Sequence, residues 1–434
     1  MSKKIISVLV MLILSFFIIL GGKEYKKSLN ENIDNSETEK ITGSKDEVVL
    51  WYSYEYYKEY LETVTEEFKQ EYGVNITLKL VNGADMLEAV SKANITGEGL
   101  PDLFITGAEN LEKAYLLGIC KENTDDIYTS EEFLEAALKS AEYKGKSYAY
   151  PLGFETATMV YNKKYVTDIP KTFKDIIDYA YNFNNVVEND DETNDDTASD
   201  GIDYSLIENI LVWDADNMIY DYGFIGDCIE FSGYYSEENV KVEIDKDKLI
   251  NSINSYKDIY NYFALLNETD KYTEIVKNFA DGKIVFSILN IESIKELEES
   301  GIDYGICQIP MLTDELNSKT LALTDLVIVN PYSDDIDITE KFAKYLTNNA
   351  TYEMYDMIGL LPAKKLEHYN SSGLEEVAKQ YNYAATIPSI LTYGDYWLKV
   401  ENLFKDINSG GDITELVNTF VADMEKMTEN NKVK

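Results

Sequence analysis

The sequence predicts an α/β fold with two lobes, and three observations support this prediction. From Val48 to Leu117, apolar strands alternate with amphipathic helices in a βαβαβα order, which builds a parallel sheet with right-handed crossovers. An apolar run from Lys146 to Asn162 is interrupted at Pro151, whose missing N–H favours a change of direction over a central strand. The 434 residues are also long enough for two or three hydrophobic cores.

The charge balance restricts the class of ligand. The 79 acidic residues exceed the 39 basic ones, and the resulting net charge of −40 repels phosphate backbones, so we exclude nucleic acid as a partner. The sequence contains no Arg, the residue that commonly clamps carboxylates and phosphates with two parallel hydrogen bonds. A neutral or cationic ligand is therefore favoured, with a codon bias against Arg as the alternative explanation.

Cysteine and histidine are too few for most metal or redox chemistry. Cys120, Cys228 and Cys307 stand in no CxxC spacing, and His368 is the only histidine. This disfavours a zinc site, a redox motif and a nucleophile that depends on His as its base. We expect buried free thiols, no metal, no cofactor and no enzymatic activity.

The N-terminal segment has the features of an export signal. Lys3 and Lys4 precede an apolar run from Ile5 to Leu20, so residues 1–22 are predicted to be a signal peptide or a membrane anchor. No Cys follows the run, and a lipid anchor is not predicted. Residues 23–46 are polar and are predicted to link this segment to a folded body outside the cell, either attached to the outer face of the membrane or secreted.

The first predicted lobe begins with a continuous apolar strand at 48–52. The predicted elements that follow are a helix ending at Gly73, a strand at 74–80, a helix at 86–93, a strand at 103–106 and a helix at 109–117. Ligands of such sheets bind beyond the carboxyl ends of the strands. The candidate binding residues are therefore in the turns after the first and third strands, at Ser53, Tyr54, Glu55, Thr106 and Glu109.

Two stretches beyond the crossing are unusual. Residues 188–203 hold eight carboxylates in sixteen positions. With Gly201 as the sixth position of a calcium loop, Ala198 and Ile207 stand at ligand positions, so a solvated loop is predicted instead. Between 209 and 226, aromatic residues alternate with carboxylates, a pattern that suits sugar stacking and hydroxyl binding but also suits packing against a helix. The candidate aromatic residues there are Trp213, Tyr220 and Tyr222.

The remaining chain is predicted to return to both lobes. Thr172 to Asp175 matches a capping box at a helix start. Pro310 and Pro362 follow apolar segments and are predicted, with Pro151, to mark the three crossings. The other predicted helices are at 251–266, 273–280, 290–298, 372–385, 393–407 and 413–428, and the other strands at 284–289, 304–309 and 326–329.

The order of several short strings resembles a known family over roughly residues 48–430. The strings are Val-Val-Leu-Trp-Tyr (48–52), Phe-Lys-Gln-Glu-Tyr-Gly-Val (68–74), Gly-Glu-Gly-Leu-Pro-Asp-Leu-Phe (97–104), Leu-Leu-Gly-Ile (116–119), Tyr-Pro-Leu-Gly-Phe-Glu-Thr (150–156), Val-Tyr-Asn-Lys (160–163), Pro-Lys-Thr-Phe (170–173), Phe-Ala-Asp-Gly-Lys (279–283) and Gly-Leu-Leu-Pro-Ala (359–363). The chain resembles the extracellular solute-binding proteins of ABC transporters, in particular the sugar-binding family that includes maltodextrin-binding proteins.

The resemblance implies a periplasmic-binding-protein-like fold of type II, with two α/β lobes joined by three hinge crossings. The implied N-terminal lobe is 47–152 plus 311–360, and the implied C-terminal lobe is 153–310 plus 361–434. Ligand would be captured by hinge closure and delivered to an ABC permease.

The resemblance also implies roles for individual residues. Ser53, Tyr54, Glu55, Thr106, Glu109 and Glu155 would contact sugar hydroxyls, and Tyr220 or Tyr222, with Tyr396 or Trp397, would be aromatic platforms. Asn290 begins an Asn-Ile-Glu-Ser string where many sugar binders have an aromatic residue, so one platform is missing. The absent lipidation Cys is a second departure from the family.

Three functions are compatible with these features. The first is a binding protein that captures a sugar or oligosaccharide for an ABC permease. The second is an anchored sensor that presents its ligand to a receptor kinase, and growth of a deletion strain on the ligand separates it from transport. The third is an extracellular glycoside hydrolase, which the βαβ order with mid-chain crossings disfavours.

Overall fold

The computed structural model describes residues 47–191, 204–232, 241–263, 265, 272–386 and 393–431. Residues from Lys45 to Lys434 form one compact unit. The predicted N-terminal segment and linker lie outside the described residues, as do residues 192–203 of the acidic stretch. No helix in the described ranges combines the length and apolar character needed to cross a bilayer.

The first sheet contains the predicted parallel βαβ series. Within the described residues, its strands follow the order β14 (Leu361–Pro362), β6 (Tyr150–Glu155), β13 (Leu321–Val329), β3 (Leu103–Gly107), β1 (Glu47–Tyr52) and β2 (Asn75–Leu80), with β15 (Ala385–Thr386) pairing β13. The strand β1 runs parallel to both β2 and β3. The strand β13 is antiparallel to β3 and to β6, so segments distant in sequence close the sheet.

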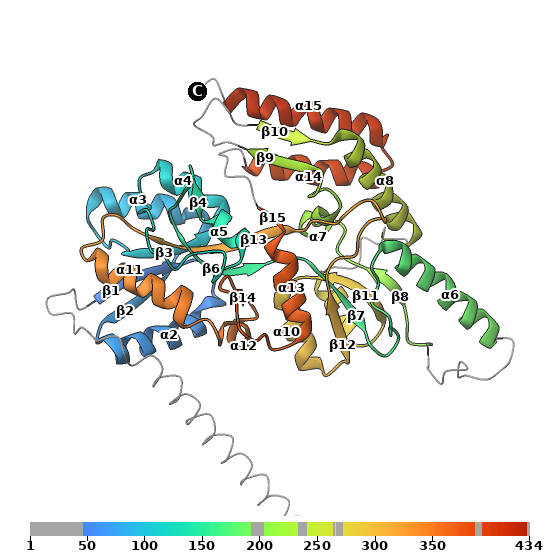
Figure 1. Cartoon of the computed structure of the whole chain (residues 1–434), viewed down its shortest axis with the longest axis horizontal. Coiled ribbons are helices and arrows are strands. Elements are labelled where there is room, and N and C mark those ends of the chain that lie inside the picture. Colours follow the sequence, from blue (N-terminus) through green and yellow to red (C-terminus); the bar gives the residue numbers. More distant parts are fainter. Residues whose placement is uncertain are drawn as a thin grey trace, which may run out of the picture. The chain divides into compact units, whose positions relative to one another are not determined.

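Helices cover both faces of this sheet (Figure 1). On one face, Leu50 of β1 belongs to a core with α2 (Tyr57–Tyr72), α11 (Ile336–Lys344) and α12 (Met354–Ile358). On the other face, Trp51 packs with α3 (Met86–Thr96) and α4 (Leu111–Leu116). Successive residues of a strand point to opposite faces, so burial on both sides requires the uninterrupted apolar run at 48–52.

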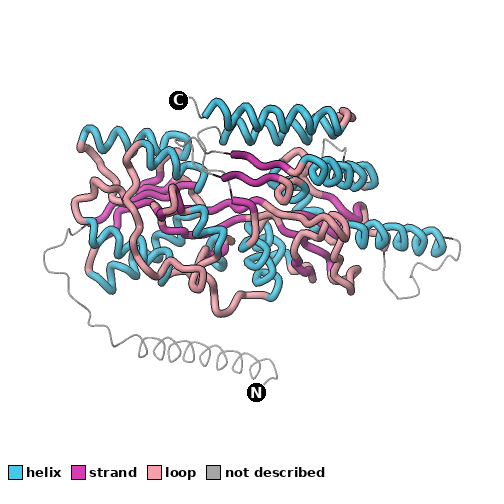
Figure 2. Tube along the Cα trace, turned by 45° about the horizontal axis from the view of Figure 1, so that its top comes forward, coloured by secondary structure: helices cyan, strands magenta, loops and turns pink. Residues whose placement is uncertain are grey.

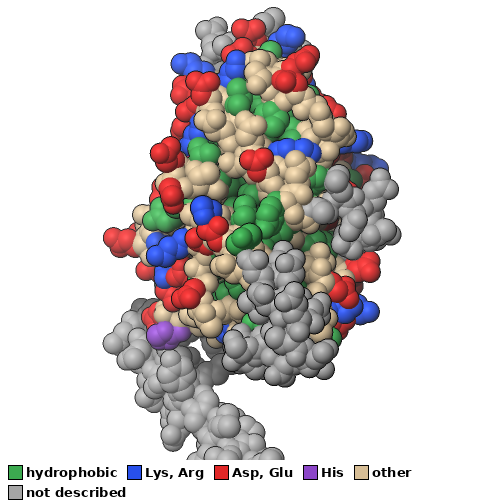
Figure 3. Space-filling model, turned by 90° about the vertical axis from the view of Figure 1, so that its right-hand side faces the viewer, with side chains coloured by type: hydrophobic (Ala, Val, Ile, Leu, Met, Phe, Trp, Pro, Cys, Tyr) green, Lys and Arg blue, Asp and Glu red, His purple; other side chains and the backbone are tan. Residues whose placement is uncertain are grey.

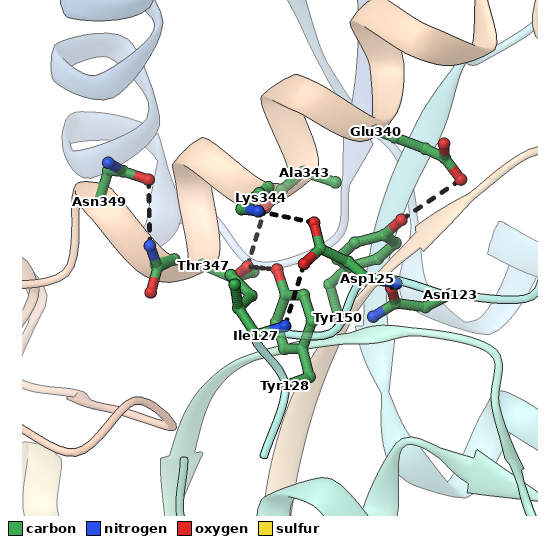
Figure 4. A network of polar contacts seen from close by, with 11 residues as sticks. Asn123, Asp125, Ile127, Tyr128, Tyr150, Glu340, Ala343, Lys344, Thr347 and Asn349 are labelled. Atoms are coloured by element: carbon green, nitrogen blue, oxygen red, sulfur yellow. Dashed lines mark hydrogen bonds and ion pairs between the residues drawn. The ribbon is translucent and has the colours of Figure 1, made fainter. Parts of the chain in front are cut away.

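A polar network attaches the loop at 121–128 to α11 and the π-helical turn η4 (Tyr345–Asn349) (Figure 4). Lys344 forms an ion pair with Asp125 at 2.8 Å, and the hydroxyls of Tyr128 and Thr347 are 2.7 Å apart. Tyr150, the first residue of β6, donates a long hydrogen bond of 3.5 Å to Glu340. The start of the strand that leads to the first crossing is thereby tied to the helical layer of this lobe.

The second sheet is smaller and has its own helices. Its strands follow the order β12 (Tyr304–Cys307), β7 (Thr158–Asn162), β11 (Ile284–Leu289) and β8 (Asn209–Val212). Figure 1 labels these strands together, away from β1, β2 and β3, and Figure 2 shows strands running through the middle of the molecule with helices around them. The accompanying elements are α6 (Phe173–Asp191), α7 (Met218–Asp221), η3 (Tyr222–Phe224), α8 (Lys246–Tyr262), α9 (Tyr272–Ala280), α10 (Ile291–Ser300), α13 (Ser372–Asn382), α14 (Tyr393–Asn408), α15 (Ile413–Asn431) and the two-stranded β9 (Ile229–Ser232) and β10 (Lys241–Ile244).

Short sequence motifs correctly predict the end of α2 and the start of α6. Gly73 ends α2 in the left-handed conformation with φ of 75°, as predicted. At the start of α6, the N–H of Asp175 donates to Thr172 Oγ1 at 3.2 Å and the N–H of Thr172 donates to Asp175 Oδ2 at 2.9 Å. This reciprocal pair confirms the predicted capping box.

The prediction that the chain changes direction at Pro151 instead of continuing a strand is wrong. The strand β6 continues through Pro151, which lies opposite Leu326 of β13, while Gly153 lies opposite Asp325. The register therefore shifts at this point, and such a bulge tolerates a residue that lacks a backbone donor. On the other side of β6, the strand β14 pairs only with Gly153 and Phe154.

Among the described residues, the chain passes from one main sheet to the other twice, and it passes once more between the lobes from β14 to α13, which contacts β12. Three neighbouring prolines do not mark these passages. Between β6 and β7 it passes from the first sheet to the second, and Pro362 of β14 pairs with Gly153 close to this point. Pro310 lies elsewhere, beside Met311, whose N–H donates to the Lys171 carbonyl. The return to the first sheet is made by β13 itself, because Leu321 packs in the core of the second lobe and Leu326 in that of the first. Pro310 is therefore not a partner of the other two prolines.

The exact lobe boundaries stay a prediction. In the described residues, strands of the first sheet extend beyond the limits predicted for the N-terminal lobe. Glu155 and the β14 residues belong to the first sheet, although the predicted boundaries assign them to the C-terminal lobe.

Figure 3 shows one side of the molecule. Asp and Glu side chains are spread over this surface among fewer Lys side chains, and apolar side chains gather near its middle.

Candidate functional site

A cavity of about 420 Å³ lies where elements of both sheets meet. Its walls come from the turns after β1 and β3, the middle of β13, the end of β6, the segment after α12, and the N-terminal parts of α10 and α14. The lining residues are Tyr54, Tyr56, Gly107, Glu109, Glu155, Asn290, Glu292, Leu323, Thr324, Asp325, Ile358, Leu360 and Trp397. Five predicted site residues are thus brought together: Tyr54, Glu109, Glu155, Asn290 and Trp397.

Aromatic rings line the cavity from two directions. Tyr54 and Tyr56, in the turn between β1 and α2, stack with ring centroids 5.3 Å apart and an interplanar angle of 12°. They are 40% and 38% exposed. From α14, Trp397 lines the cavity and donates its indole N–H to Glu401 at 2.8 Å. The cavity therefore has flat apolar surfaces on both lobes.

Two carboxylates lie at the first sheet, Asp325 in β13 and Glu109 in the turn after β3. Asp325 of β13 accepts hydrogen bonds from the hydroxyls of Tyr57 at 2.8 Å and Tyr56 at 3.3 Å. Burial raises the pKa of Asp325, and these two hydrogen bonds oppose the rise. Burial also raises the pKa of Glu109, which a backbone hydrogen bond lowers and the charge of Asp325 raises further.

Glu155 joins the end of β6 to the start of α10. Its carboxylate accepts from the backbone N–H groups of Thr156 at 2.9 Å, Ile291 at 2.6 Å and Glu292 at 3.2 Å. Two of these donors are the first N–H groups of α10, where a negative charge is favoured. Burial nevertheless raises the pKa of Glu155 to about 8. The side chain thereby connects the end of a strand of the first sheet to a helix of the second lobe.

Asn290 and the two tyrosines behind it shape the same corner. Asn290 caps α10, since its side-chain oxygen accepts from the Ser293 N–H at 3.1 Å. The hydroxyl of Tyr272 donates to that oxygen at 2.5 Å, and the ring of Tyr272 stacks on Tyr220 at 5.1 Å and 11°. Tyr220 is therefore behind the lining residues rather than among them.

Besides Tyr220, six predicted residues do not line the cavity. Thr106 is buried and accepts from Asn110 Nδ2, and Trp213 is buried with its indole N–H donated to Asp221 at 2.7 Å. Tyr222 and Tyr396 are buried and joined through their hydroxyls at 2.9 Å. The other two, Ser53 and Glu55, are in the turn between β1 and α2 but do not line the cavity, and the side chain of Glu55 is 66% exposed.

The aromatic and acidic pattern of 209–226 is explained by packing. The ring of Trp213 stacks on Phe224 in the core of the second lobe, and the buried Asp221 accepts its indole N–H. Burial raises the pKa of Asp221 well above its ordinary value. Of the two alternatives that the sequence left open for this stretch, packing against helices describes Trp213 and Tyr222.

Sequence reasoning missed Asp325 and Glu292. The strand β13 was predicted only from Leu326 onward, so Asp325 fell outside it. A single carboxylate inside the apolar string Leu-Ala-Leu-Thr-Asp-Leu-Val-Ile-Val was the available signal, because an acid is rarely buried without a partner or a function. Glu292 follows the cap residue Asn290, and only the position of α10 at the cavity identifies it.

Comparison of the sequence with known proteins identifies the family to which the chain belongs. A family model described as bacterial extracellular solute-binding protein matches residues 63–366, and the chain belongs to this family. It is 23% identical to the maltodextrin-binding protein MdxE of Bacillus subtilis, over 83% of this chain and 85% of that protein. It is also 23% identical to a maltooligosaccharide ABC transporter solute-binding lipoprotein of Streptococcus pneumoniae, over 82% of each chain.

Solved structures show the same two-lobed α/β fold. A cyclo/maltodextrin-binding protein complexed with maltotetraose matches with a TM-score of 0.70 and 19% identity, covering 89% of this chain and 98% of that chain. An extracellular solute-binding protein from Staphylococcus aureus in complex with maltose also matches with a TM-score of 0.70 and 19% identity, covering 90% and 99%. The predicted fold class and family resemblance are thereby confirmed.

Proposed function

We propose that this solute-binding protein captures an oligosaccharide in the cavity between its lobes and delivers it to an ABC permease. The observation that carries the proposal is the composition of the cavity walls, with aromatic faces from both lobes and carboxylates between them. Aromatic faces stack on the apolar faces of sugar rings, while carboxylates accept hydrogen bonds from hydroxyls.

Hinge closure is the proposed mechanism. The first lobe contributes Tyr54, Tyr56 and Asp325, and the second contributes Asn290 and Trp397. A ligand that contacts both sets binds the closed state more tightly than the open state, and this difference in affinity stabilises closure.

Two further findings support a carbohydrate ligand. The relatives are named for maltodextrin and maltooligosaccharide, and one of the similar structures contains maltotetraose. We propose that binding is not followed by catalysis, in keeping with a family defined by solute binding.

Isothermal titration with maltose, maltotriose, maltotetraose and oligosaccharides of other linkages tests the proposal. At least one should bind, raise the melting temperature and be taken up less well by a deletion strain. Failure of every carbohydrate to bind, with binding of peptides instead, would overturn the carbohydrate part. Normal uptake by the deletion strain, with ligand binding intact, would instead overturn delivery to a permease.

A further inference from the structure

The cavity has an unbalanced charge. Its lining residues include four carboxylates, Glu109, Glu155, Glu292 and Asp325, and no Lys. None of the four forms an ion pair with another described residue, although many other carboxylates of the chain do. Glu155 accepts from three backbone N–H groups and Glu292 is exposed, which leaves Glu109 and Asp325 as the half-buried pair without a positively charged neighbour in the described part of the chain.

Glu109 and Asp325 lie at the same part of the first sheet. Asp325 pairs across the sheet with Gly107. The carboxylate of Glu109 folds back over the same glycine, because a Cβ added to Gly107 would lie 2.2 Å from Glu109 Oε2. The two carboxylates therefore stand over one point of the sheet.

The neighbours of this pair supply hydrogen bonds but no positive charge. Asp325 accepts from two tyrosine hydroxyls, and Glu109 accepts from Asn110 Nδ2 at 3.1 Å. Burial raises the pKa of both carboxyl groups. Two like charges in a poorly solvated site repel each other, and a cation placed between or beside them relieves both the repulsion and the desolvation.

A bound metal ion is a poor match for this charge. Among the described residues, no group of three or more His, Cys, Asp and Glu side chains is close enough together to hold one. The carboxylates instead lie along a cavity whose walls also carry Tyr54, Tyr56 and Trp397. Aromatic faces attract ammonium groups as well as sugar rings. An extended organic cation fits this distribution better than a single ion does.

We propose that the natural ligand carries at least one ammonium group, which lies against Glu109 and Asp325. This inference rests on the proposed function, and together they identify the ligand as an amino sugar oligomer. A linear polyamine shares the ammonium chemistry without the sugar rings, and the experiment separates the two. The net charge of −40 additionally favours the approach of a cationic ligand.

Isothermal titration with four probes tests the inference. The probes are a trimer of glucosamine, its fully N-acetylated counterpart, maltotriose and spermidine. The glucosamine trimer should bind at least about tenfold more tightly than the N-acetylated trimer, as expected for a partly buried ion pair. Raising NaCl from about 0.02 M to about 0.5 M should reduce this preference, since salt screens the attraction.

Two variants and one control connect the preference to the acidic pair. Glu109→Gln should remove most of the preference for the glucosamine trimer over the N-acetylated trimer, and Asp325→Asn provides a second measurement if the first variant does not fold. Glu59→Gln removes the same charge from an exposed position of α2 and should keep the preference. Retention of the full preference in folded Glu109→Gln and Asp325→Asn would overturn the assignment to these residues.

The outcomes separate the inference from the proposed function. Equal binding of the neutral and cationic sugars would overturn the ammonium group and leave sugar capture intact. Binding of spermidine with no binding of any sugar would support the ammonium group and overturn the sugar. Absence of binding by both amines would overturn the inference, whatever the neutral sugars do.

Discussion

At the scale of single residues, Trp397 is the aromatic side chain that the second lobe presents to the cavity. Trp397→Ala should weaken oligosaccharide binding by about 1–2 kcal/mol, because stacking and apolar burial are lost together. Isothermal titration measures the effect. The neighbouring Leu398 is 56% exposed and is not in the cavity lining, so Leu398→Ala is the matched control and should bind normally. Equal loss in both variants would point to a disturbed α14 instead of a lost contact.

Glu155 should make the stability of the ligand-free protein depend on pH. Its pKa in the folded protein is raised to about 8 from an ordinary value of 4.5, so between these values the folded state binds more protons than the unfolded state. Stability from this group is therefore fully present below about pH 4.5 and is lost as pH rises through 8, by up to about 1.4 kcal/mol per pH unit.

Glu155→Gln should reduce this slope, because an amide keeps an acceptor oxygen for the α10 N–H groups but does not titrate. Urea unfolding at several pH values between 5 and 8 measures it. The raised pKa values of Glu109 and Asp325 add slope of the same sign, so the variant keeps part of the dependence. An unchanged slope in Glu155→Gln would contradict the prediction.

At the scale of elements, Gly226 lets the turn after η3 approach the segment that precedes β13. A Cβ at Gly226 would lie 2.1 Å from the Lys319 carbonyl oxygen, whereas one at Gly223 would meet nothing closer than 3.9 Å. Gly226→Ala should therefore destabilise the protein by about 1–3 kcal/mol or more through overpacking, and Gly223→Ala should change stability by less than about 1 kcal/mol. Chemical denaturation compares them, and equal stability of the two variants would show that the backbone at Lys319 adjusts freely.

Elements with strong local patterns were predictable from the sequence. The strand β11 agrees with the predicted 284–289 because it is a continuous, fully buried run. The helix α2 agrees with the predicted helix because its end signal, Gly73, is clear. The strand β13 was predicted too short. Its first residues alternate between two cores and a cavity, so the sequence there does not follow one hydrophobic pattern.

The candidate site was predictable only where it follows strand ends. Tyr54 and Glu109 come directly after parallel strands, and the rule for carboxyl ends found them. Trp213 and Trp397 could not be separated by sequence, because both are aromatic residues near carboxylates. Only the fold shows that one stacks in a core and the other lines the cavity.

At the scale of the whole molecule, the net charge of −40 opposes the compact state through self-repulsion. Surface ion pairs such as Lys113 with Glu88 and Lys146 with Glu122 recover little, because exposed pairs contribute about 0–1 kcal/mol each. Since salt screens repulsion among many like charges more than it weakens a few exposed pairs, the melting temperature of the ligand-free protein should rise between about 0.02 M and 0.3 M NaCl.

The salt response of stability should be opposite to that of ligand affinity. Differential scanning calorimetry in NaCl measures the first, and a matched series in sucrose controls for general effects on apolar burial. If the ligand carries an ammonium group, added salt stabilises the empty protein while it weakens binding, because repulsion within the chain and attraction to the ligand are screened alike. A melting temperature that falls with NaCl would show that the ion pairs, and not the excess carboxylates, dominate the electrostatic free energy of folding.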